Sequence, residues 1–153
     1  KGKIEGRILK SRLDFDSYDE AVKVVNDFNP DVIGISTMTF YRDFCHRLIS
    51  FLREKGIKTP LFVGGPYPTG DFENVLKDRN IDLCSLGEGE VTVAELVKEM
   101  IKNGNKLPKQ EVLKEIPGLA FVEEKKFLID LLFERLNTPL KKRASKLYLL
   151  ILV

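Results

Sequence analysis

Three short segments of this sequence place glycines or hydroxyl side chains directly after apolar runs: Ser36–Thr39, Gly64–Thr69 and Gly87–Glu90. Serine and threonine hydroxyls donate or accept hydrogen bonds, and glycines without a Cβ let the backbone approach a ligand closely. A helix that begins after Gly89 would present free backbone N–H groups, which favour an anion. These residue types indicate binding of a ligand.

Each segment taken alone also has an ordinary structural interpretation. The Gly64–Pro66 sequence is typical of a simple turn after a strand. Glu88 and Glu90 near a helix start are typical partners of the helix dipole. Ser36 and the neighbouring threonines are typical helix caps. A binding site therefore requires that the fold bring the three segments together.

Alternating strand and helix patterns provide the elements that would bring them together. Apolar strand patterns are followed by helical spacing, as in the capping box Ser17–Glu20, which predicts a helix that ends at Asn29-Pro30. This alternation predicts an α/β fold with a doubly wound, mostly parallel sheet, whose ligands bind at the carboxyl ends of the strands. The predicted strands are Ile4–Leu9, Asp31–Ile35, Leu61–Val63 and Ile81–Leu86, and helices are expected around Phe44–Leu52, Phe72–Leu76 and Val93–Ile101.

The pattern changes after Gly104, so we expect a first unit at 1–104 and a second at 105–153 that packs on or completes the same domain. The second unit begins with a lysine-rich polar linker and continues with a predicted hairpin of Gly118–Val122 and Phe127–Asp130. Leu131–Lys146 is expected to be partly helical, with an interruption at Pro139. Leu147–Val153 has strand character.

Composition excludes several classes of function. The net charge of +2 is too small to indicate a nucleic-acid or membrane-surface partner. The basic cluster at 141–146 lacks interleaved aromatic residues and is expected to be a solvated face. The sequence has two cysteines, Cys45 and Cys84, which are expected to be buried in a cytoplasmic protein. Its lone histidine, His46, lies within a helical pattern, and no catalytic residues are predicted.

A resemblance to a known family lies in the order and spacing of four segments, DVIGISTMT (31–39), FVGGPYPT (62–69), LGEGEVTVAEL (86–96) and IPGLAF (116–121). The chain resembles, from about Ile8 to Val122, the N-terminal cobalamin-binding domain of radical S-adenosylmethionine enzymes, including the group called magnesium-protoporphyrin IX monomethyl ester cyclase-like.

The resemblance implies a flavodoxin-like (Rossmann-like) sheet that binds cobalamin at its carboxyl edge. It implies a module that binds and orients the cofactor without catalysing a reaction alone, next to a radical S-adenosylmethionine catalytic domain. Ser36 and Thr37 would contact the nucleotide tail, and the glycines would leave room for it. The residues implied for cofactor binding are Ser36, Thr37, Met38, Thr39, Gly64, Gly65, Pro66, Gly87, Glu88 and Gly89.

Three of the family's features are missing from this sequence: an Asp-x-His-x-x-Gly motif, a Cys-x-x-x-Cys-x-x-Cys motif, and the strand–helix unit expected before Ile4–Leu9. We therefore predict no metal ligand and no iron–sulfur cluster in this chain. Lys146–Val153 is apolar enough to fill the vacant central position beside Ile4–Leu9, or to enter a partner chain and form a homodimer. The alternative function is a truncated or degenerate relative that has lost the cofactor and serves in interaction or oligomerisation.

Overall fold

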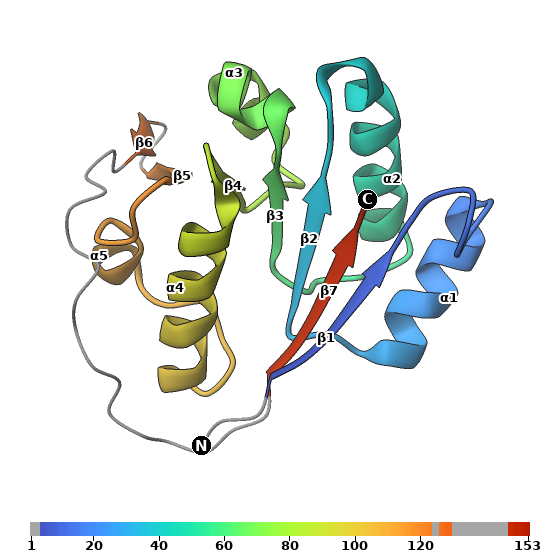
Figure 1. Cartoon of the computed structure of the whole chain (residues 1–153), viewed down its shortest axis with the longest axis horizontal. Helices are drawn as coiled ribbons and strands as arrows, with labels where there is room; N and C mark the ends of the chain where they lie inside the picture. Colours follow the sequence, from blue (N-terminus) through green and yellow to red (C-terminus); the bar gives the residue numbers. More distant parts are fainter. Residues whose placement is uncertain (1–3, 124–125, 130–146) are drawn as a thin grey trace.

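The computed structural model describes residues 4–123, 126–129 and 147–153, which form a seven-stranded sheet with the order β1-β7-β2-β3-β4-β5-β6 (Figure 1). The first five strands in this order are parallel, while β5 and β6 run antiparallel to their neighbours. The strands are β1 (Ile4–Leu9), β2 (Val32–Ser36), β3 (Leu61–Gly64), β4 (Leu83–Ser85), β5 (Leu119–Glu123), β6 (Lys126–Ile129) and β7 (Leu147–Leu152). The helices are α1 (Tyr18–Phe28), the short 3-10 turn η1 (Thr39–Tyr41), α2 (Arg42–Glu54), α3 (Pro66–Lys77), α4 (Gly89–Lys102) and α5 (Gln110–Leu113).

The predicted capping residues of α1 are confirmed. The hydroxyl of Ser17 accepts a hydrogen bond from the backbone N–H of Glu20 at 3.2 Å, which satisfies one free donor of the first turn. The carboxylate of Glu20 accepts from the backbone N–H of Asp16 at 2.7 Å. The helix ends at Asn29, which adopts the left-handed conformation with φ 47°. Local hydrogen bonding therefore fixes both ends of this helix.

The C-terminal strand β7 lies between β1 and β2, which confirms that this segment fills the central position beside Ile4–Leu9. It is parallel to both neighbours, with Leu147 opposite Ile4 and Leu149 opposite Val32. Leu150 is completely buried. The structure places β7 in the sheet of its own chain, and a homodimer formed through this tail stays a prediction.

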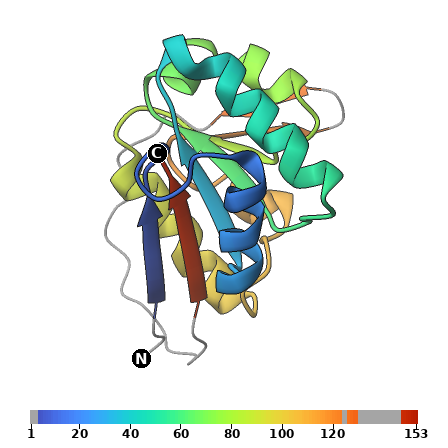
Figure 2. The ribbon, with the colours of Figure 1, turned by 90° about the vertical axis from the view of Figure 1, so that its right-hand side faces the viewer.

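Counting β7 first turns the order of the parallel strands into 2-1-3-4-5, the order of a flavodoxin-like sheet. The predicted fold class is therefore confirmed. In Figure 2, α1 lies on one side of the sheet and α4 on the other. In such a sheet the order reverses between the strands counted first and third, which are β7 and β2, and ligands bind at that switch point.

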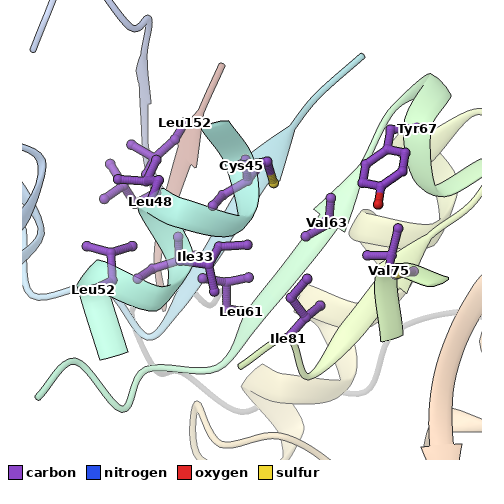
Figure 3. Close-up of a cluster of buried hydrophobic side chains, with 14 of the residues drawn as sticks. Ile33, Cys45, Leu48, Leu52, Leu61, Val63, Tyr67, Val75, Ile81 and Leu152 are labelled. Carbon is purple, nitrogen blue, oxygen red and sulfur yellow. The ribbon is translucent and has the colours of Figure 1, made fainter. Parts of the chain in front are cut away.

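Two apolar clusters hold the helices to the two faces. The first joins α1, α2 and α3 to the sheet, and Figure 3 shows Leu48 and Leu52 of α2 beside Ile33 of β2 and Leu61 of β3. The second joins α4 and α5 to the opposite face and includes Leu96. Alternate residues of each central strand enter different clusters, as expected for a strand covered on both faces.

Some element boundaries differ from the sequence prediction. Helix α3 begins at Pro66, so most of the expected Gly64–Thr69 loop is helical, and proline is well suited to that first helical position. The next helix, α4, was expected to begin after Gly89, and it begins at Gly89 itself. The predicted linker contains the one-turn helix α5. The predicted hairpin is confirmed and joins the main sheet through β4. The predictions for 131–146, including the helix and the basic cluster, lie outside the described residues.

Truncating Leu150 to alanine should reduce the free energy of unfolding by about 2–5 kcal/mol, because the change leaves a cavity at a fully buried position of the central strand. Urea unfolding followed by circular dichroism measures the loss. The matched control is Ile8→Ala on β1, where the side chain is 65% exposed and the change should cost less than about 1 kcal/mol. Equal effects of the two substitutions would contradict a central position for β7.

Candidate functional site

Backbone hydrogen bonds join the predicted loops into one rim at the carboxyl edge of the sheet. The N–H of Thr37 donates to the carbonyl of Gly64 at 3.0 Å, and the N–H of Tyr67 donates to the carbonyl of Thr37 at 3.2 Å. The hydroxyl of Thr69 donates to the carbonyl of Gly65 at 2.8 Å and accepts from the N–H of Gly87 at 3.0 Å. The three segments singled out in the sequence are thus adjacent in space.

Gly65 has a structural reason to be glycine. Its φ is 94°, a conformation that other residues rarely adopt, and a Cβ there would lie 2.9 Å from the carbonyl oxygen of Thr37. The neighbouring backbone already fills the space that a side chain would need. Gly65 therefore shapes the turn into α3, and its lack of a side chain need not reflect an approaching ligand.

Gly64 differs, because a Cβ there would have no neighbour closer than 3.8 Å and its backbone does not require glycine. Those nearest atoms belong to Ser85 at the end of β4. A Cβ on Gly89 would lie 3.1 Å from the Ser85 hydroxyl oxygen. Ser36 is paired with Gly64 in the ladder between β2 and β3. We call these four residues, Ser36, Gly64, Ser85 and Gly89, the Ser85 cluster.

The Ser85 hydroxyl has no hydrogen-bond partner within the described part of the chain, although the residue is only 2% exposed. A buried polar group left unpaired costs about 1–3 kcal/mol. Ser85 therefore has an unused capacity to bond a ligand or a water molecule. Helix α4 begins close by at Gly89, and its N-cap residue Glu88 makes no side-chain capping bond, so backbone N–H groups of its first turn lack that partner.

A cavity of about 610 Å³ opens at the same edge, on the face covered by α1 and α2. Its floor includes Ile35 of β2 and Leu152 of β7, so it lies over the switch point of the sheet. The cavity is lined by Ser11, Arg12, Phe15, Asp16, Ser17, Tyr18, Ile35, Ser36, Thr37, Met38, Tyr41, Phe44, Cys45, Leu48, Leu152 and Val153.

Of the predicted binding residues, Ser36, Thr37 and Met38 line this cavity, and the other seven do not. Thr37 is buried, whereas Met38 is half exposed and Thr39 opens η1. Sequence reasoning missed the aromatic lining residues. Tyr18 and Phe44 have helical spacing, which is also the spacing of core residues, and no signal in the sequence separates the two roles.

His46 is held by neighbours from a different helix. Its Nδ1 lies 2.6 Å from a carboxylate oxygen of Asp78, and its Nε2 lies 3.1 Å from the hydroxyl of Tyr67. Burial, and secondarily the negative charge of Asp71, raises the pKa of Tyr67. The histidine thus links α2 to both ends of α3. The described residues contain no group of three or more side chains suited to hold a metal ion.

The two cysteines are buried and unpaired. Burial raises the pKa of the Cys45 thiol to about 12, with a smaller contribution from the charge of Asp78. Burial likewise raises the pKa of Cys84 to about 12. Because the thiolate is the nucleophile and the metal ligand, these shifts favour a packing role for both residues.

Comparison with known proteins adds family information to this geometry. The B12 binding domain family matches residues 8–97. The anaerobic magnesium-protoporphyrin IX monomethyl ester cyclase of Synechocystis sp. is 35% identical over 98 residues, which are 63% of this chain and 18% of that protein. The cytidylyl-2-hydroxyethylphosphonate methyltransferase of Streptomyces wedmorensis is 33% identical over 90 residues, 58% of this chain and 16% of that protein. The chain thus spans less than a fifth of the length of these relatives.

The buried thiols should react slowly with the thiol reagent DTNB in the folded protein at about pH 8, and rapidly after unfolding in guanidinium.

The same burial predicts that the protein loses stability in alkali. The unfolded thiols ionise near their ordinary pKa of 9.0, while the folded ones stay neutral to about 12. The contribution of these thiols to stability should therefore be constant below pH 9 and fall between pH 9 and about 12, by about 1.4 kcal/mol per pH unit for each thiol.

The control for both measurements is the double variant Cys45→Ala/Cys84→Ala. Whatever its stability at neutral pH, this variant should lose the part of the fall in stability above pH 9 that comes from the thiols, because alanine cannot ionise. Rapid, stoichiometric labelling of the folded protein would show that a thiol is accessible and reactive.

Proposed function

This chain belongs to the B12-binding domain family, and on that premise we propose that it binds cobalamin at the carboxyl edge of its sheet. The observation that carries the proposal is the hydroxyl of Ser85, which is buried beside Gly64 and has no partner among the described residues. A buried donor without a partner, next to a position where the backbone has no side chain, suits a ligand that supplies the missing hydrogen bond.

The residues of this edge fit the chemistry of cobalamin. The cofactor carries amide side chains and a nucleotide tail with a phosphate, all of which form hydrogen bonds. Ser36, Thr37 and Ser85 offer hydroxyls at this edge, and the start of α4 at Gly89 offers backbone N–H groups and the positive end of a helix dipole to the phosphate. Gly64 leaves its strand end open.

Other residues implied by the resemblance support the site indirectly. Gly65 and Pro66 form the turn into α3, and Gly87, with φ 65°, is bonded to Thr69. We assign these residues the role of holding the rim in shape. Direct contacts to cobalamin from them, and from Met38, Thr39 and Glu88, stay predictions.

The proposed role of the chain is to bind and orient the cofactor. Cobalamin supplies the cobalt chemistry when it is bound, and a separate domain would supply the reaction. Because the chain corresponds to less than a fifth of each relative and resembles the cobalamin-binding domain of radical S-adenosylmethionine enzymes, we propose a radical S-adenosylmethionine catalytic domain as its partner. The division at residue 104 stays a prediction. The strands after it, β5, β6 and β7, belong to the same sheet as those before it.

The alternative proposal is an interaction domain without a cofactor. It is favoured by the exposed apolar side chains of Met38, Phe40 and Tyr41 at the same edge, which are 50%, 88% and 61% exposed. Exposed apolar groups of this kind often mark the binding surface for a protein partner.

None of the helices that the structure describes has the length and apolar character needed to cross a membrane.

Titration with hydroxocobalamin, followed by gel filtration and an absorbance spectrum of the protein peak, tests the proposal. Cobalamin should be retained by the parent protein. Ser85→Ala should weaken binding by about three- to tenfold, the effect of one hydrogen bond. Gly64→Val should abolish retention, because the new side chain occupies the open strand end.

Gly70→Ala is the matched control for Gly64→Val, because no atom lies within 4 Å of the added methyl group. It should bind like the parent protein. Gly64→Ala, which fits at ordinary contact distance, replaces the valine variant if circular dichroism shows that the latter does not fold. Absence of pigment from the folded parent protein would refute cobalamin binding and leave the interaction domain.

A further inference from the structure

The cavity between α1 and α2 lies on the other face of the sheet from the Ser85 hydroxyl, although Ser36 of the Ser85 cluster also lines it. Its floor includes Ile35 and Leu152, whose side chains belong to the apolar cluster on the α1–α2 face. Ser85 is two residues beyond Leu83, whose side chain enters the cluster on the opposite, α4 face. Strand side chains alternate between faces, so the sheet itself separates the cavity from Ser85. A ligand in the cavity need not displace one at the Ser85 cluster.

The lining of the cavity suits a flat apolar group. Phe15, Leu48 and Leu152 are buried, and the rings of Tyr18 and Phe44 pack with their centroids 5.6 Å apart. Tyr41 also lines the cavity and is 61% exposed. A volume of about 610 Å³ lies within the range of sites for small organic molecules. Aromatic walls favour an aromatic ligand, because rings pack well face to edge and offset.

The polar lining favours a negative substituent on that ligand. Arg12 is the only lysine or arginine among the lining residues, and no ion pair is seen for its guanidinium in residues 4–123, 126–129 and 147–153. Helices α1 and α2 both begin at the cavity, next to Ser17 and Tyr41, and helix N-termini carry partial positive charge. Acidic residues in the first turns, together with Asp16 in the lining, offset part of this potential.

We propose that this cavity is a second binding site, which takes a planar aromatic molecule bearing a carboxylate or a similar anionic group. The aromatic ring lies against Tyr18, Tyr41 and Phe44, and the anionic group is bound by Arg12 at the rim. Guanidinium groups bind carboxylates through paired hydrogen bonds. Ser36 and Thr37 border both proposed sites, but Arg12 and the aromatic wall belong to the cavity alone, so the aromatic ligand is expected to bind without cobalamin.

The probes for the test are naphthoate, as the aryl carboxylate, and naphthylmethanol, as its neutral counterpart. Amide chemical shifts of the isotope-labelled protein report both the affinity and the place of binding. Naphthoate should bind saturably at concentrations below about 1 mM and shift amides around the cavity. Saturating hydroxocobalamin should leave its affinity unchanged.

Two variants separate the charge from the apolar wall. Arg12→Gln should weaken naphthoate binding by about three- to tenfold and leave naphthylmethanol binding unchanged. Tyr41→Ala should weaken binding of both probes, and its exposed side chain makes a loss of folding unexpected. Arg7→Gln, at an exposed position of β1 outside the cavity lining, is the matched charge control and should bind naphthoate like the parent protein.

Three results would overturn the proposal. The first is no saturable binding of naphthoate, and the second is amide shifts centred away from the cavity. The third is competition between naphthoate and hydroxocobalamin, which would make the cavity part of the cobalamin site. If cobalamin fails to bind but naphthoate binds with the expected variant pattern, the second site stands and only the cofactor proposal fails.

Discussion

The insertion of β7 between β1 and β2 is the interaction on which the rest of this structure depends. Asp31, just before β2, donates its N–H to the carbonyl of Tyr148 and accepts the N–H of Tyr148 on its carboxylate, both at 2.8 Å. The same carboxylate accepts from the side-chain amide of Asn105. These bonds hold the start of β7 to β2 and to the end of α4. Without β7, β1 and β2 would lose the backbone partners they share with it.

This insertion also creates the switch point of the sheet. With β7 in place, the strand order reverses at its boundary with β2, and the segments that follow neighbouring strands diverge there. The cavity lies over this boundary on the α1–α2 face. The Ser85 cluster runs along the same edge from the end of β2 to the start of α4, and its Ser85 hydroxyl lies on the α4 side of the sheet. One edge of the sheet therefore offers two chemically different surfaces, one aromatic and bordered by Arg12, and one formed by small and hydroxyl residues.

The backbone of the rim is held in place by hydrogen bonds within the rim itself. Thr37, Gly65, Thr69 and Gly87 exchange hydrogen bonds among themselves and with their neighbours, so the backbone of the rim is held before any ligand arrives. Pre-formed sites avoid the cost of ordering loops on binding. Within this network Ser85 is an exception, since its buried hydroxyl lacks a partner in the described residues. A satisfied frame around one unsatisfied group is the arrangement expected of a binding site.

The sequence by itself determined the features that depend on neighbours in the chain. The Ser17 cap, the end of α1 at Asn29 and the apolar strands follow from local hydrogen bonding and periodic burial. The loop motifs were identified through the resemblance to the B12-binding family. The sequence also indicated that 146–153 could fill a central strand, but left open which chain would receive it. Only the tertiary structure decided that β7 pairs with β1 and β2 of the same chain and that Gly65 is required by packing against Thr37. It also decided that the Ser85 hydroxyl has no partner in the part of the chain that the structure describes. Those outcomes depend on contacts between residues far apart in the chain, and no local pattern encodes such contacts.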